Sequence, residues 1–289
     1  MGNKKFKLLI LAVFCVFFLT GCRRDDMDGI EISVTNYPNE YIVDQLYGDH
    51  SSIESVYPDG IDTNTFKVSK RQKDKYSQSG LFIYNGLIKK ERSLAVDLLD
   101  KNQNLKIIDS AYVLETEYSP NELWLNPSSM LMMAQNIRTG LKEYITSTYL
   151  QKDIDKKYNN LKIRLSELDA DYRIAVENTD DKNLLVADDD LKYLEKFGLN
   201  IICINKDIDD KTYSNAEELI KNGSISYIYL FKGNKLNSKA KKLTSDYPDL
   251  KTSELHKIDN LSDSDRENKK DYISLMESNL GLLKQEFHQ

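Results

Sequence analysis

Residues 154–175, IDKKYNNLKIRLSELDADYRIA, form the most regular stretch of the chain. Apolar side chains recur in it at alternating spacings of four and three residues, which is the period of one face of an α-helix. The stretch lacks glycine and proline, so it predicts one stiff helix over residues 149–178. About 24 helical residues extend roughly 36 Å, enough to run the length of a small domain. A short coiled coil is the alternative interpretation.

On both sides of this helix, short apolar runs alternate with helical patterns, as in parallel βαβ units. We therefore predict two small α/β lobes, an N-terminal lobe over residues 30–148 and a C-terminal lobe over residues 179–289. The predicted strands span residues 30–35, 52–57, 81–84, 106–109, 183–187, 199–205, 225–230 and 252–258.

Length and composition are consistent with two globular lobes. The chain has 289 residues, of which 40% are hydrophobic, and a formal net charge of -6. The acidic balance argues against nucleic acid as a partner, and three scattered cysteines exclude a disulfide scaffold. We find no nucleophile elbow, P-loop, dinucleotide turn or HExxH motif, so we do not expect an enzyme.

The first 21 residues read as an export signal, with three lysines followed by a short apolar run over residues 8–19. A membrane-spanning helix needs about 20 apolar residues. The signal ends in Leu19-Thr20-Gly21-Cys22, which resembles the lipobox of bacterial lipoproteins, where the cysteine is acylated. We expect a lipid on Cys22, a tether over residues 22–29, and a body held at the extracytoplasmic face of the membrane. An ordinary cleaved signal is the alternative. The excess of lysine over arginine favours a Gram-positive source.

Several segments resemble, in the same order, the solute-binding lipoproteins of the zinc/manganese ABC importer family, which includes metal-binding adhesin-type lipoproteins. The resembling stretches are VTNYP (34–38), GID (60–62), LFIYNGL (81–87), LWLNP (123–127), YLEKFGL (193–199) and YISLMESNL (272–280). The resemblance implies two parallel four-stranded sheets flanked by helices, joined by one long helix, with a metal ion between the lobes. It also implies a monomer that delivers its ion to an ABC permease and its ATPase.

The resemblance places the metal ligands at Asn64, Glu122, Asp188 and Asp259. Relatives carry histidine at the first two positions and histidine or glutamate at the third, so this chain has exchanged the histidines for oxygen donors. Oxygen donors suit hard cations. We therefore expect manganese or another hard divalent cation to be favoured over zinc, with no organic cofactor.

Each of these residues also has a structural interpretation. Asn64 suits a turn, Glu122 an exposed position at a helix entry, Asp188 a helix N-terminus, and Asp259 an N-cap or turn. His256 is an alternative ligand. Cys203 fits a small buried apolar residue, and Met130, Met132 and Met133 fit a helix core.

Two functions follow from the sequence. The first is capture of a divalent cation between the lobes for delivery to an importer. The second is a family member that has lost metal transport and acts as a surface interaction or adhesion lipoprotein. Retention of an oxygen donor at each of the four positions favours the first.

Overall fold

The computed structural model describes residues 25–287. The predicted signal and residues 22–24 of the predicted tether, Cys22 among them, lie outside these residues. Within the described part of the chain, no helix is long and apolar enough to cross a membrane.

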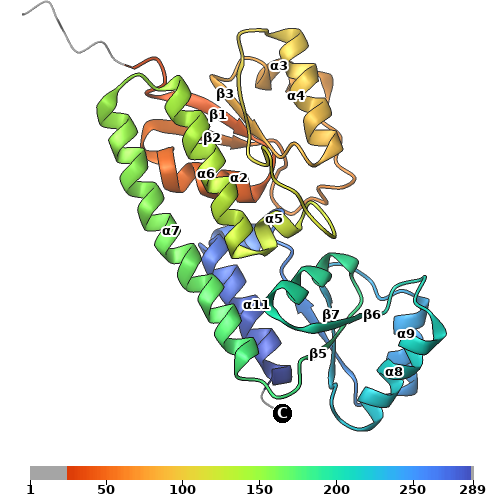
Figure 1. Cartoon of the computed structure of the whole chain (residues 1–289). Helices are drawn as coiled ribbons and strands as arrows, with labels where there is room; N and C mark the ends of the chain where they lie inside the picture. The colour runs from red at the N-terminus through yellow and green to blue at the C-terminus, as the bar shows by residue number, and fades with distance from the viewer. Residues whose placement is uncertain (1–24, 288–289) are drawn as a thin grey trace, which may run out of the picture.

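The N-terminal lobe is built on a four-stranded parallel sheet in the order β2-β1-β3-β4 (Figure 1). Its strands are β1 (Ile30–Val34), β2 (Ser51–Ser55), β3 (Leu81–Tyr84) and β4 (Lys106–Asp109). Its helices are α2 (Tyr37–Tyr47), α3 (Lys70–Tyr76), α4 (Lys89–Lys101), α5 (Glu122–Leu125) and α6 (Pro127–Tyr144), with a short 3-10 turn at Gly48–His50.

The C-terminal lobe repeats this design with a parallel sheet in the order β6-β5-β7-β8. Its strands are β5 (Asn183–Val186), β6 (Asn200–Cys203), β7 (Tyr227–Phe231) and β8 (Lys251–Leu255). Its helices are the 3-10 helix η2 (Asp189–Phe197), α8 (Asp210–Lys221), α9 (Ser238–Asp246), α10 (Asp263–Glu267) and α11 (Tyr272–Phe287). The predicted α/β class with two parallel four-stranded sheets is confirmed.

The long helix α7 (Thr148–Glu177) joins the two lobes and runs beside both of them (Figure 1). Its N-cap is Ser147, whose side chain accepts a hydrogen bond from the amide of Leu150. Its apolar stripe is buried against α2, α6 and α11 of the same chain. This intramolecular packing accounts for the stripe, so no coiled-coil partner is needed to cover it.

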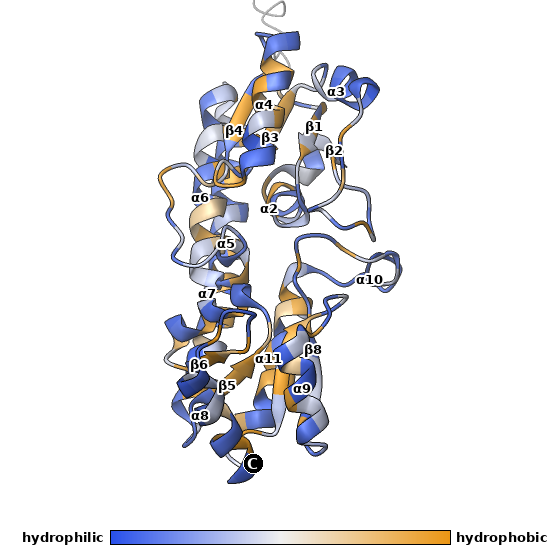
Figure 2. Cartoon of the chain, turned by 90° about the vertical axis from the view of Figure 1, so that its right-hand side faces the viewer, coloured by the Kyte–Doolittle hydropathy of each residue, from blue (hydrophilic) through white to orange (hydrophobic). Residues whose placement is uncertain are grey.

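One apolar core continues from the N-terminal lobe into the C-terminal lobe. At the junction, the ring centroids of Tyr41 and Tyr272 lie 5.5 Å apart, and the Tyr272 hydroxyl donates to the carbonyl of Trp124 at 2.5 Å. Two smaller cores lie elsewhere, one in each lobe. In Figure 2, β4 and β5 carry hydrophobic residues and α8 is largely polar. The shared core packs the two lobes directly against each other.

Met132 is an exception to the predicted helix core. Its side chain is 47% exposed, whereas Met130 and Met133 are fully buried. All three lie on α6, where residues at consecutive positions point in different directions around the helix. The prediction of a buried Met132 was therefore wrong.

Candidate functional site

A pocket of about 320 Å³ lies in the cleft and is lined by residues of both lobes. Several of these residues follow the carboxyl ends of parallel strands, where open α/β sheets bind their ligands. We call it the cleft pocket. Its lining residues are Asn36, Thr63, Asn64, Ile88, Lys90, Glu91, Ser119, Pro120, Asn121, Trp124, Asp190, Lys257 and Asp259.

The N-terminal lobe contributes Asn64, from the loop after β2. Its side chain is exposed, and its backbone amide donates to Oδ1 of Asp62 at 2.9 Å. This is the turn geometry expected of the structural interpretation. The same loop places Thr63 against the other lobe, where its hydroxyl donates to Oδ2 of Asp259 at 2.7 Å.

The C-terminal lobe contributes Asp259, from the loop after β8. Besides Thr63, its Oδ2 contacts Nζ of Lys257 at 3.1 Å. Between these two residues Ile258 has a φ of 61°, a strained value for a β-branched residue. The two charged residues on either side of Ile258 both line the cleft pocket. A cation entering the pocket would therefore compete with the ammonium group of Lys257 for Asp259.

Glu122 does not line the cleft pocket, although it was predicted as a ligand. It opens α5, is only 1% exposed, and forms an ion pair with Lys196 of η2. Its Oε2 also accepts the backbone amides of Glu117 and Tyr118 at 3.1 and 3.2 Å. The alternative expectation of an exposed position at a helix entry is wrong, because the carboxylate is buried between the lobes.

Asp188 does not line the cleft pocket either, and its carboxylate is hydrogen-bonded elsewhere. Its two oxygens accept the amide of Phe231 at 2.6 Å and the Asn234 side chain at 3.0 Å. Burial raises the pKa of Asp188, and its side chain makes no cap hydrogen bond to η2. From the same acidic run, it is Asp190 that lines the cleft pocket, where it accepts from Asn121 at 2.5 Å.

The structure thus brings Asn64 and Asp259 to one pocket and places Glu122 and Asp188 elsewhere. Across residues 25–287, no group of three or more His, Cys, Asp and Glu side chains is placed to hold a metal ion.

His256 follows β8 and does not line the cleft pocket. Cys203 is half-buried rather than fully buried, and burial raises the pKa of its thiol to about 12.

Sequence reasoning missed Lys90 and Lys257, the two cations of the cleft pocket. Lysine is abundant in this chain, so no local signal marks these two. It also missed Glu91, a fully buried carboxyl of α4 that accepts from the Thr35 hydroxyl and from the amide of Asn85 at 2.9 Å. Burial raises the pKa of Glu91 to about 7.

Glu91 predicts a pH-dependent stability. Its pKa rises from an ordinary 4.5 to about 7 on folding, so the stability that it contributes is complete below pH 4.5 and is lost as the pH rises through 7. Relative to Glu91→Gln, the wild type should lose about 3 kcal/mol of unfolding free energy between pH 4.5 and pH 8. Urea denaturation at both pH values measures this. Glu286→Gln is measured as a control, because burial raises the pKa of the Glu286 carboxyl to about 7 as well. A stability difference between the wild type and Glu91→Gln that is equal at both pH values would contradict the assignment.

Two lobes on one long helix, with a polar pocket in the cleft, define a solute-binding protein. A family model described as "ZnuA: Zinc-uptake complex component A periplasmic" matches residues 32–286, and the chain belongs to this family. Its members are solute-binding proteins and not enzymes, which confirms the prediction from the absence of catalytic motifs.

Curated relatives include the zinc-binding lipoprotein AdcA of Streptococcus pneumoniae (strain R6), 26% identical over 96% of this chain. The zinc-binding protein AdcA of Streptococcus pyogenes serotype M3 is 23% identical over 97% of this chain. The chain spans about 60% of the length of these relatives (60% and 61%).

Solved structures share the fold. The Zn(II)-bound ZnuA-like domain of Streptococcus pneumoniae AdcA has a TM-score of 0.73 at 21% identity, covering 90% of this chain and 100% of that one. The metal-dependent lipoprotein YcdH of Bacillus subtilis has a TM-score of 0.74 at 17% identity, covering 89% and 98%. The expected preference for manganese over zinc is corrected by these comparisons, because the relatives are named for zinc and AdcA was solved with Zn(II) bound.

Proposed function

We propose that this chain is the extracytoplasmic solute-binding component of an ABC importer, that the cleft pocket receives its solute, and that the solute is zinc. The observation that supports this most directly is the pocket itself, because both lobes line it at the strand ends. The relatives that are named for zinc support zinc as the cation. The lipid on Cys22 would hold the protein near the permease and its ATPase.

Within the pocket, Asp259 and Asn64 are the two predicted ligands that a cation could reach together. Zinc binds most tightly where histidine or cysteine is present, and here it meets oxygen atoms and the ammonium group of Lys257. We therefore expect weaker zinc binding than at a histidine site, and binding should release Lys257 from Asp259.

A zinc titration of the metal-stripped protein tests this proposal. Zinc should raise the melting temperature, since a ligand that binds only the folded state stabilises it, and manganese should do so less. Asp259→Ala should weaken zinc binding at least tenfold, and Lys257→Met should strengthen it. Asp249→Ala, an exposed aspartate outside the pocket, is the matched control. Zinc binding that survives Asp259→Ala would refute the placement of the site.

A second function is favoured by the ion pairs themselves. Glu122 and Asp259, two of the predicted carboxylate ligands, are already paired with lysines, as expected of a member that no longer carries metal and acts through surface interactions. One structural neighbour, the laminin-binding protein of Streptococcus agalactiae, is described as bifunctional, with adhesin and metal-transporting activity. Absence of any zinc effect on the wild type would select this second function.

A further inference from the structure

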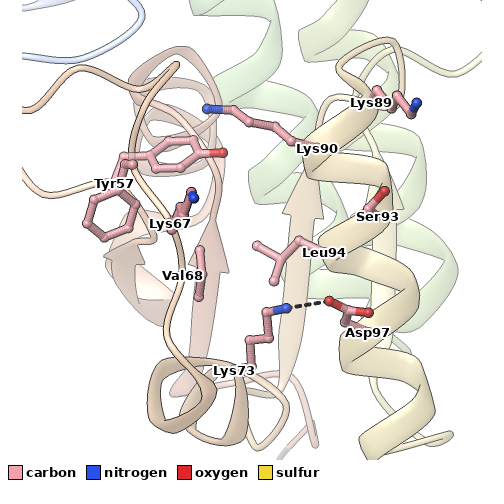
Figure 3. Close-up of a pocket in the computed structure, with 10 residues that line it drawn as sticks. Tyr57, Lys67, Val68, Lys73, Lys89, Lys90, Ser93, Leu94 and Asp97 are labelled. Atoms are coloured by element: carbon pink, nitrogen blue, oxygen red, sulfur yellow. Dashed lines mark hydrogen bonds and ion pairs between the residues drawn. The ribbon is translucent and has the colours of Figure 1, made fainter.

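A second and larger pocket lies within the N-terminal lobe, between the loop after β2 and helices α3 and α4 (Figure 3). We call it the lysine pocket. Its volume of about 610 Å³ is within the range of small-molecule sites, roughly 300 to 1,000 Å³. It shares only Lys90 with the cleft pocket.

The apolar part of the lysine pocket extends one of the two smaller cores. Tyr57 and Leu94 belong to that core, and Phe66 and Val68 pack against it. The rings of Tyr57 and Phe66 meet edge to face, with centroids 5.8 Å apart. Such an arrangement offers aromatic surface to a planar ligand.

The charged part of the pocket is basic. Four lysines and one aspartate line it. The aspartate, Asp97, is already paired with Lys73 at 2.5 Å (Figure 3). No ion pair to a described residue engages Lys67, Lys89 or Lys90. In Figure 3, Lys89 points away from the pocket while Lys90 extends over Tyr57.

Lys90 is the most informative of these lysines. Its Nζ atom is buried and has no hydrogen-bond partner among the described residues. It lies 4.6 Å from the centroid of the Tyr57 ring, and the charges of Glu91, Asp259 and Asp62 act on it without a hydrogen bond. A buried ammonium group without a hydrogen-bond acceptor is costly, and burial lowers the pKa of Lys90. An anionic oxygen in the pocket would remove this cost.

We propose that the lysine pocket binds an organic anion with an aromatic body. The anionic group pairs with Lys90 and Lys67, and the ring system lies against Tyr57, Phe66 and Leu94. The site shares Lys90 with the cleft pocket, but the proposal does not depend on the importer function.

The probe for this site is 8-anilinonaphthalene-1-sulfonate, which joins an aromatic body to one anionic group. Calorimetric titration of the folded protein should show one saturable site. The neutral N-phenyl-1-naphthylamine, which has the same rings without the sulfonate, should bind at least tenfold more weakly. Equal binding of the neutral compound, or no saturable site for the sulfonate, would overturn the proposal.

Two variants locate the binding. Lys67→Glu should weaken sulfonate binding at least tenfold, and because Lys67 lines the lysine pocket and not the cleft pocket, this result also excludes binding in the cleft. Lys90→Met should have a similar effect and should fold at least as stably, since it removes an unpaired buried charge. Lys235→Glu, an exposed lysine of the C-terminal lobe, is the matched control. Unchanged affinity in Lys67→Glu and Lys90→Met would refute the site.

Discussion

Replacing Lys196 by methionine is expected to lower the free energy of unfolding by about 3 to 5 kcal/mol, the usual effect of leaving a buried charge unpaired. The charge is that of Glu122, which is 1% exposed and forms no ion pair with another described residue. Two backbone amides would still donate to this carboxylate, which favours the lower end of the range. Urea denaturation of wild type and variant measures the loss.

A matched control is available on the same 3-10 helix. Lys192 forms an ion pair with Asp189 three residues away, and both side chains are more exposed than Glu122. Lys192→Met should therefore cost less than about 1 kcal/mol. The double variant Glu122→Gln with Lys196→Met should recover much of the lost stability, because no unpaired charge remains. Equal losses from Lys192→Met and Lys196→Met would contradict the assignment.

The same variant tests whether Glu122 takes part in cation binding. If Glu122 were a ligand, removing Lys196 would free its carboxylate and zinc affinity would rise. We expect zinc affinity to stay unchanged, since the carboxylate remains held by two amides outside the cleft pocket. Glu122 is thus expected to anchor α5 to η2 across the lobe junction.

The sequence predicts the framework well because buried parallel strands are short apolar runs that follow one another at regular intervals. The runs at 81–84 and 106–109 coincide with β3 and β4. The helix α7 was equally predictable from its apolar stripe, because a helix that packs along both lobes must keep one face apolar over its whole length.

The site was less predictable because its contacts join residues far apart in the chain. Glu122 and Lys196 are 74 positions apart, and neither position by itself indicates the ion pair. Likewise, the family resemblance placed a ligand at Asp188, yet hydrogen bonds to Phe231 and Asn234 hold it outside the cleft pocket. A resemblance identifies the position of a ligand, but the partners of the substituted side chain decide where that side chain points.

Replacing Trp124 by alanine is expected to cost about 3 to 5 kcal/mol, as for other large buried aromatic residues. Trp124 is 1% exposed. Its indole nitrogen donates to the carbonyl of Lys257 at 3.0 Å, and its own carbonyl accepts from the Tyr272 hydroxyl. Both partners belong to the C-terminal lobe, so this residue joins the lobes beside the cleft through one side-chain and one backbone hydrogen bond. Thermal and urea unfolding measure the effect.

Trp124→Phe separates packing from positioning. Phenylalanine fills much of the same volume but leaves the carbonyl of Lys257 without its donor, at a cost of about 1 to 3 kcal/mol. The strained turn at Ile258 then loses one of its contacts and keeps the bond from the amide of Tyr37 to the carbonyl of Asp259, 3.2 Å long, and the bond from the Thr63 hydroxyl to the Asp259 carboxylate. We expect Asp259 to be held less firmly and zinc affinity to fall in this variant.

Tyr272→Phe is the control, because it removes the other hydrogen bond to Trp124 and leaves the turn untouched. It should lower stability by about 1 kcal/mol without changing zinc affinity. The zinc affinities of Trp124→Phe and Tyr272→Phe are measured at a temperature well below thermal unfolding, so that loss of folded protein does not contribute. Equal zinc affinities in the two phenylalanine variants would mean that Trp124 holds the lobes together without positioning Asp259.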